Sequence, residues 1–144
     1  MKLKDSKEIL SSVLKTTQMG QIGIRSALEA EMKPELRQAM EAQLQEYDAI
    51  ETQAHSIAAE RNWVLPELNP SIRFMTDRMT KMKLSYGEVN SKIAEMMIRG
   101  NTSGVIKGLK NLQHMEQQED SVSDLSLKLL YTESANVDQM KQFL

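Results

Sequence analysis

The sequence contains no cysteine, only three prolines and six glycines in 144 residues, and 4 % aromatic residues. Disulfides, thiolate metal sites and a cysteine nucleophile are therefore excluded, and a reducing compartment fits. The formal net charge of −2 gives no overall attraction to nucleic acid or to an acidic membrane. There is no run of roughly 18 apolar residues for a membrane helix, and no signal-peptide core. We expect a cytoplasmic protein without a transmembrane segment.

The residues that are present favour helices over strands. Hydrophobic residues make up 40 % of the chain and are mostly Met, Leu, Ile and Ala. The length fits one domain, residues 1–144. We therefore predict an all-α fold, an up-down antiparallel four-helix bundle with a kinked or split C-terminal helix. The expected helices span about residues 5–31, 34–61, 70–99, 102–117 and 121–143.

Local signals set the expected helix ends. Asp5 and Glu8 have capping-box spacing, and Pro34 suits the first turn of the second helix. Asn69 followed by Pro70 reads as an N-cap and a first-turn proline. Gly100 predicts a left-handed C-terminal stop, after which residues 101–103 offer the next N-cap.

The clearest pattern is a heptad in the expected third helix. Alternating steps of three and four place apolar or aromatic side chains on one stripe, which predicts one wall of the bundle. The stripe consists of Ile72, Met75, Met79, Met82, Tyr86, Val89, Ile93 and Met96. In the next helix the expected buried residues are Val105, Leu109, Leu112 and Met115. Beyond Met115 the stripe loses phase, which indicates a kink or break near residues 117–121.

Two histidines bear on the question of a metal site. Di-iron and di-manganese bundles use a Glu-x-x-His motif on each of two helices. Thr52 precedes His55 by three positions and Asn111 precedes His114, so neither motif is present. Glu51 and His55 are four apart and share a helix face, so they could meet one iron, manganese or zinc ion. The alternative is a hydrogen bond at the edge of the stripe, or simple solvent exposure.

Polar residues also fall on the expected inner stripes, and buried polar groups need hydrogen-bond partners. One interpretation is a hydrogen-bonded layer that fixes the helix register, and the other is a small-ligand pocket. The layer would consist of Thr17, Gln21, Gln43, Tyr47, Tyr86 and Asn90. Glycines inside the first helix, Gly20 and Gly23, each cost roughly 1 kcal/mol relative to alanine, which indicates close helix approach or a bend.

Three stretches carry a resemblance to a known family. They are residues 17–24 (TQMGQIGI), residues 33–37 with 43–47 (KPELR and QLQEY), and residues 129–141, which begin LLYTE. These resemble the spore coat protein F and related ferritin-like families of unknown function in Firmicutes. The resemblance implies a ferritin-like four-helix bundle and a spore or stress context, and it carries no catalytic residues. The missing Glu-x-x-His motifs depart from true ferritins.

These observations lead to three hypotheses about function. The first is a non-enzymatic structural or interaction protein that assembles with itself or with a coat-like partner, in the cytoplasm or on the spore. The second is a ferritin-like metal-binding protein that uses Glu51 and His55, with Glu29 or Glu46 as a further candidate ligand. The third is a small-ligand sensor built around Gln21, Tyr47 and Tyr86. No catalytic or cofactor-binding residue is assigned.

Overall fold

The computed structural model describes residues 3–84, 87–115 and 120–144, and these residues form an all-α fold. No strand is present in these three ranges, where one isolated bridge joins Lys4 to Met115. The elements are α1 (Ser6–Ala27), α2 (Pro34–Glu60), α3 (Pro70–Lys83), α4 (Val89–His114), α5 (Asp120–Met140) and the short 3₁₀ helix η1 (Lys141–Phe143).

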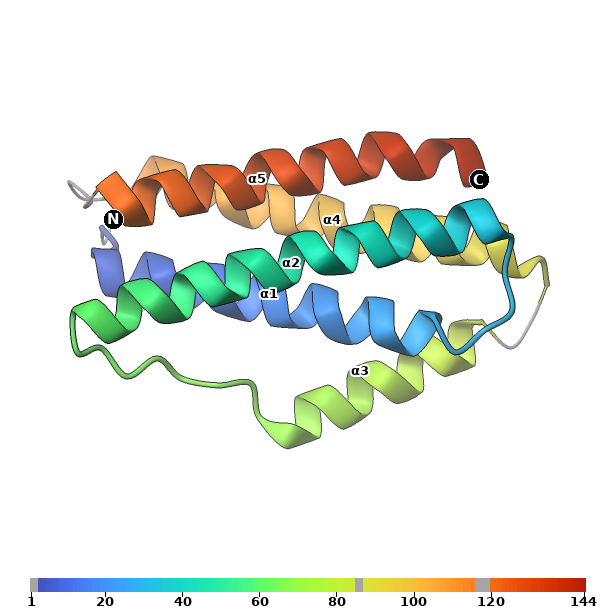
Figure 1. The fold of residues 1–144 in the computed structure, drawn as a ribbon, viewed down its shortest axis with the longest axis horizontal. Coiled ribbons are helices and arrows are strands. Elements are labelled where there is room, and N and C mark those ends of the chain that lie inside the picture. Colours follow the sequence, from blue (N-terminus) through green and yellow to red (C-terminus); the bar gives the residue numbers. More distant parts are fainter. Residues whose placement is uncertain (1–2, 85–86, 116–119) are drawn as a thin grey trace.

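Four of the helices, α1, α2, α4 and α5, lie side by side, and α3 lies outside them against α1 (Figure 1). The helices α1 and α2 form one antiparallel hairpin, and α4 and α5 form another. Because the chain returns along the bundle through α3, α4 runs in the same direction as α2. The bundle therefore consists of two hairpins joined by one long connection, and strictly alternating helix directions are not observed.

Apolar side chains from these four helices form one continuous core. Its largest fully buried members include Ile9, Leu14, Ile24, Met40 and Ile93. At the end of α2, Trp63 packs against this core and the Arg61 guanidinium lies 5.7 Å from the centre of its ring. The core thus closes over the end of the bundle where the long connection begins.

The local start signals are confirmed. The Asp5 carboxylate accepts a hydrogen bond from the Glu8 backbone amide at 2.8 Å, and Pro34 begins α2. Asn69 caps α3 by accepting from the Ser71 amide at 2.8 Å. Each signal acts through residues within one turn, so it can be recognised from the local sequence.

The predicted helix over residues 70–99 is wrong, because two helices occupy that range. Helix α3 ends at Lys83, Gly87 has a φ of +78°, and α4 begins after Glu88. A left-handed φ suits glycine, and the Glu88 carboxylate accepts hydrogen bonds from the Asn90 and Ser91 amides. These two features make residue 88 a complete helix start. Tyr86 lies outside the described residues.

The predicted stop at Gly100 is also wrong. Helix α4 continues through Gly100 to His114, and Asn101 is a buried residue inside it rather than an N-cap. A single glycine costs only about 1 kcal/mol in a helix interior, and packing of α4 against α5 outweighs that cost. Helix α4 ends at His114 and α5 begins at Asp120. The kink or break predicted near residues 117–121 falls mostly on residues 116–119, which lie outside the described residues.

The heptad stripe does not form a wall of the bundle. Only its α4 part includes a fully buried residue, Ile93, whereas its α3 residues are exposed. The exposed fractions are 44 % for Ile72, 60 % for Met75, 52 % for Met79 and 68 % for Met82. In α4, Leu109 and Leu112, which were expected to be buried, are also exposed. The face of α4 that points into the bundle carries small and polar residues in their place. That face includes Asn101, Gly104 and Asn111.

Within the ranges that the structure describes, no helix is both long and apolar enough to cross a membrane.

Candidate functional site

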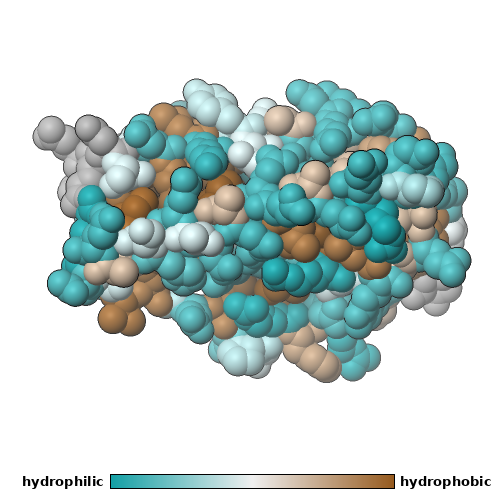
Figure 2. Space-filling model, in the orientation of Figure 1, coloured by the Kyte–Doolittle hydropathy of each residue, from teal (hydrophilic) through white to brown (hydrophobic). Residues whose placement is uncertain are grey.

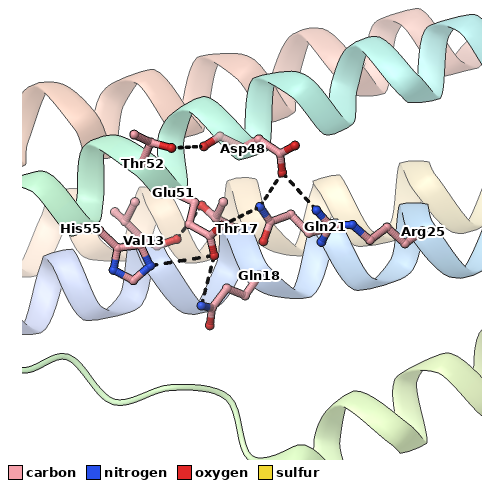
Figure 3. A network of polar contacts seen from close by, with 9 residues as sticks. All are labelled: Val13, Thr17, Gln18, Gln21, Arg25, Asp48, Glu51, Thr52 and His55. Carbon is pink, nitrogen blue, oxygen red and sulfur yellow. Dashed lines mark hydrogen bonds and ion pairs between the residues drawn. The ribbon is translucent and has the colours of Figure 1, made fainter.

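A polar network lies between α1 and α2 at the surface of the bundle (Figure 3). The Gln21 side-chain amide donates to Asp48 at 2.8 Å and to Glu51 at 3.2 Å. Arg25 lies 3.3 Å from the same Asp48 oxygen, and Gln18 donates to Glu51 at 3.3 Å. Gln18 and Gln21 are almost fully buried, while Asp48 and Glu51 are partly exposed. The network therefore joins α1 to α2 along one edge of the core.

The proposed metal ligands, Glu51 and His55, are part of this network. The Glu51 Oε2 and His55 Nε2 atoms are 4.0 Å apart, one turn of α2 from each other. Both Glu51 oxygens also accept amide hydrogen bonds from α1. In the described part of the chain, no group of three or more His, Cys, Asp or Glu side chains is arranged to hold a metal ion. The pair on its own offers at most two protein ligands.

The other residues of the predicted polar layer are distributed among separate contacts. Thr17 donates to the Val13 carbonyl of its own helix at 2.7 Å. Gln43 donates to Gln139 at 2.8 Å, which links α2 to α5. Asn90 does not lie in the interior; it is half-buried at the start of α4, where it accepts from the Lys33 amide at 2.8 Å. Tyr86 lies outside the described residues.

Tyr47 is the centre of a second, fully internal cluster. Its hydroxyl oxygen lies 2.9 Å from Asn101 Oδ1 on α4 and 2.9 Å from Glu133 Oε2 on α5. The Asn101 amide in turn donates to the Met97 carbonyl at 2.8 Å. Tyr47, Asn101 and Glu133 are all at most 3 % exposed. We call these three residues the buried triad.

Two glycines make room for the buried triad. A Cβ atom at Gly20 on α1 would lie 2.6 Å from the Tyr47 ring carbons Cε2 and Cζ. A Cβ atom at Gly104 on α4 would overlap the Glu133 carboxyl group. Both contacts are closer than a Cβ atom tolerates. The absence of a side chain at Gly20 and Gly104 therefore allows α1 and α4 to approach the triad closely.

The carboxyl group of Glu133 lies in an unusual electrostatic environment. Burial raises its pKa from 4.5 to about 7, against an opposing effect of the hydrogen bond with Tyr47. Its Oε1 atom is buried and has no hydrogen-bond partner among the described residues. Burial and the neighbouring Glu133 charge also raise the pKa of the Tyr47 hydroxyl. A buried carboxyl group whose pKa lies near neutral pH is the strongest chemical feature of the interior.

The periodic pattern of the sequence predicts a buried Tyr47, but Glu133 and Asn101 were not predicted to lie beside it. A signal for Glu133 was present in the sequence, because Val122, Leu125 and Leu129 recur in steps of three and four, and the next apolar residue of this series is Met140. Steps of four and three from Leu129 lead to Glu133 and Asn136, and both are buried. Asn101 could not be found in this way, since the expected helix break at Gly100 placed it in a cap.

A different feature marks the outer surface of α3, where apolar side chains face away from the bundle. We define the α3 stripe as Ile72, Met75, Met79 and Met82, all more than 40 % exposed. In Figure 2 the visible surface is mainly hydrophilic, with hydrophobic patches at its upper left, in its centre and along its lower edge.

Comparison with known proteins supports the fold but identifies no family. No family model matches the chain, and no curated protein matches it. A solved structure does resemble it: the crystal structure of a DUF305 fragment from Deinococcus radiodurans superposes with a TM-score of 0.76. The match covers 99 % of this chain and 97 % of that one at 12 % sequence identity. At this identity the likeness shows that the two chains share an all-α fold.

Proposed function

We propose that this protein is a non-enzymatic interaction module that associates with a second copy of itself through the α3 stripe. The observation that carries the proposal is the reversed amphipathicity of α3. Helices on the surface of a globular protein normally turn their apolar face toward the core. In α3 the polar face lies against the bundle and the apolar face lies in solvent.

The contacts on the inner side of α3 are polar. Asp77 accepts a hydrogen bond from Ser26 of α1, and Lys81 lies 2.9 Å from Glu29, just beyond the end of α1. Thr80 is 5 % exposed and donates to the Thr76 carbonyl at 2.8 Å. These contacts fix the orientation of α3 and leave its methionines outside. The polar docking thus holds the stripe in a position where it can contact another molecule.

The composition of the α3 stripe supports a second copy as the occupant. Its members recur in steps of three and four, so they form one continuous apolar row. An uncharged apolar row can pack against the same row of a second copy across a two-fold axis. Methionine side chains adapt readily to such a contact.

The chain topology supports placing this module among ferritin-like bundles. Ferritin-like folds have one long crossover connection between two helical hairpins, and the segment containing α3 is such a connection here. We also propose a spore or stress context, in the cytoplasm or on the spore, which rests on the resemblance of three sequence stretches to spore coat protein F.

The test is the mass of the particle as a function of concentration, measured by sedimentation velocity and light scattering. The variant is the triple substitution Met75→Gln, Met79→Gln and Met82→Gln, since glutamine and methionine have similar helix propensities. We expect concentration-dependent dimers for the wild type and a monomer for the triple variant. Met19→Gln is the matched control, because Met19 is 38 % exposed, belongs to α1 and is not a member of the stripe.

A wild-type protein that stays monomeric at every concentration would contradict the proposal. Dimers that persist unchanged in the triple variant would also contradict it, because they would show that another surface drives the association.

A further inference from the structure

The hydrogen atoms available to the buried triad determine how it can be bonded. A tyrosine hydroxyl carries one hydrogen, and an asparagine Oδ1 atom can only accept. Tyr47 lies 2.9 Å from Asn101 Oδ1 and 2.9 Å from Glu133 Oε2, so an ionised Glu133 would leave two acceptors competing for one hydrogen. One of those short contacts would then be a repulsive approach of two oxygen atoms.

Rotating the Asn101 amide does not resolve this conflict. Its Nδ2 atom donates to the Met97 carbonyl at 2.8 Å. A flipped amide would donate to Tyr47 but would place Oδ1 against that carbonyl, which is also an acceptor. The orientation of Asn101 is thus fixed by α4 itself, and the missing hydrogen has to come from Glu133.

We propose that Glu133 is an internal proton-binding site: it is held as a neutral carboxylic acid that donates to Tyr47, and loss of its proton loosens α5 from α2 and α4. The protonated Oε2 atom donates to the Tyr47 oxygen, Tyr47 donates to Asn101 Oδ1, and Asn101 donates to the Met97 carbonyl. Every hydrogen in this chain then has one acceptor, and the chain links all three helices. When the proton leaves, this arrangement is lost and a carboxylate remains in the interior.

Among the described residues, no positively charged group contributes to the pKa of Glu133, so none stabilises its carboxylate. From α2 the triad receives Tyr47, and the adjacent Glu46 is acidic with a pKa that burial raises. The neighbours from α4, Asn101 and Gly104, are neutral. From α1, Gly20 lies against the triad, and Thr17, one turn before it, is also neutral. Burial is the largest cause of the raised pKa of Glu133, which agrees with this arrangement.

The proposal is tested first on the wild-type protein by carbon NMR of its side-chain carboxyl groups. The Glu133 signal is assigned by its loss in the Glu133→Gln variant. We expect the shift of a protonated carboxyl at pH 5.5 and a titration midpoint near neutrality. A Glu133 signal that is already ionised at pH 5.5 would overturn the proposal.

The second measurement compares urea unfolding of the wild type and Glu133→Gln between about pH 5 and pH 8. Glutamine is isosteric and can donate to Tyr47 as the neutral acid does, but it does not titrate. Relative to this variant, the wild-type unfolding constant is expected to rise about tenfold per pH unit until it levels off near pH 7. Glu41→Gln, at an exposed position of α2, is the matched control and should follow the wild type at every pH.

Hydrogen exchange localises the effect. Amides of α5 should lose protection with rising pH in the wild type beyond the loss seen in Glu133→Gln. Parallel pH profiles of the two proteins, in unfolding or in exchange, would show that Glu133 is not the proton-binding group. This inference does not depend on self-association through α3, because each measurement can be made on the monomer.

Discussion

The two glycines of α1 allow a direct test of the packing around Tyr47. Gly20→Ala would place a Cβ atom 2.6 Å from the Tyr47 ring, whereas Gly23→Ala would meet no atom within 4 Å. Both substitutions remove a helix-interior glycine, so each gains about 1 kcal/mol from helix propensity. The difference between the two variants therefore isolates the clash with Tyr47 from the effect on the helix.

The size of the clash follows from how firmly Tyr47 is held. Its ring is 2 % exposed and its hydroxyl is fixed by Asn101 and Glu133, so it cannot rotate into solvent. Overpacking in such a site typically costs about 1–3 kcal/mol. Because both variants share the propensity gain, we expect Gly23→Ala to be more stable than the wild type by about 1 kcal/mol, and Gly20→Ala to be about 1–3 kcal/mol less stable than Gly23→Ala.

The assay is equilibrium urea unfolding followed by circular dichroism and by Trp63 fluorescence. The midpoints should separate in the stated order with the same dependence on urea, which shows that stability and not compactness has changed. Equal stability of the two variants would refute the close approach of Gly20 to Tyr47. It would also refute the conclusion that the missing side chain at Gly20 makes room for the triad.

Four further results are expected. Gly100→Ala should stabilise α4 by about 1 kcal/mol in urea unfolding, since residue 100 lies inside the helix with open space around it. A destabilised variant would instead support a helix end at Gly100, as the sequence predicts. Glu133→Gln should raise the free energy of unfolding by about 3 kcal/mol above pH 7, because a folded-state pKa of about 7 against 4.5 makes native stability fall as pH rises between these values. Tyr47→Phe should cost about 1–3 kcal/mol in urea unfolding, because it leaves a buried acceptor unpaired. Asp77→Asn should weaken the docking of α3 on α1. The hydrogen bond from the Ser26 hydroxyl, and then that from Lys81, lower the pKa of Asp77, so in the wild type this docking should be lost as pH falls below 3.8. The NMR shifts of the α3 amides would report both effects.

The helix starts were predictable because their causes are local. Asp5 and Asn69 accept hydrogen bonds from amides within one turn, Pro34 has a φ already set for a first helical turn, and a helix begins at each signal. The stops were less predictable, because the sequence offers glycines at both 87 and 100. Only the first has a positive φ and is followed by a capping carboxylate. Packing of α4 on α5 decided against the second, and no local pattern contains that information.

The site was predictable only in part, for a related reason. Burial of Gln21 and Tyr47 follows from their position on the inner stripes of α1 and α2. Their partners do not follow from it: Gln21 meets neighbouring residues of α2, whereas Tyr47 meets Glu133, 86 positions away in the sequence. A periodic pattern indicates which side chains point inward, but which of them meet depends on how the helices cross.

The α3 stripe shows the same limit and also sets the strength of the proposed association. The stripe and the inner face of α4 belong to one heptad pattern, yet the break after α3 turns its first half to solvent. Fully burying such a side chain gains about 1.5–3 kcal/mol, and these are already about half covered. Eight of them in a two-fold pair would therefore gain about 8 kcal/mol, against an association cost of about 4–15 kcal/mol. Pairing through the α3 stripe alone should thus be weak and visible only at high protein concentration, and a tight dimer would require additional surface.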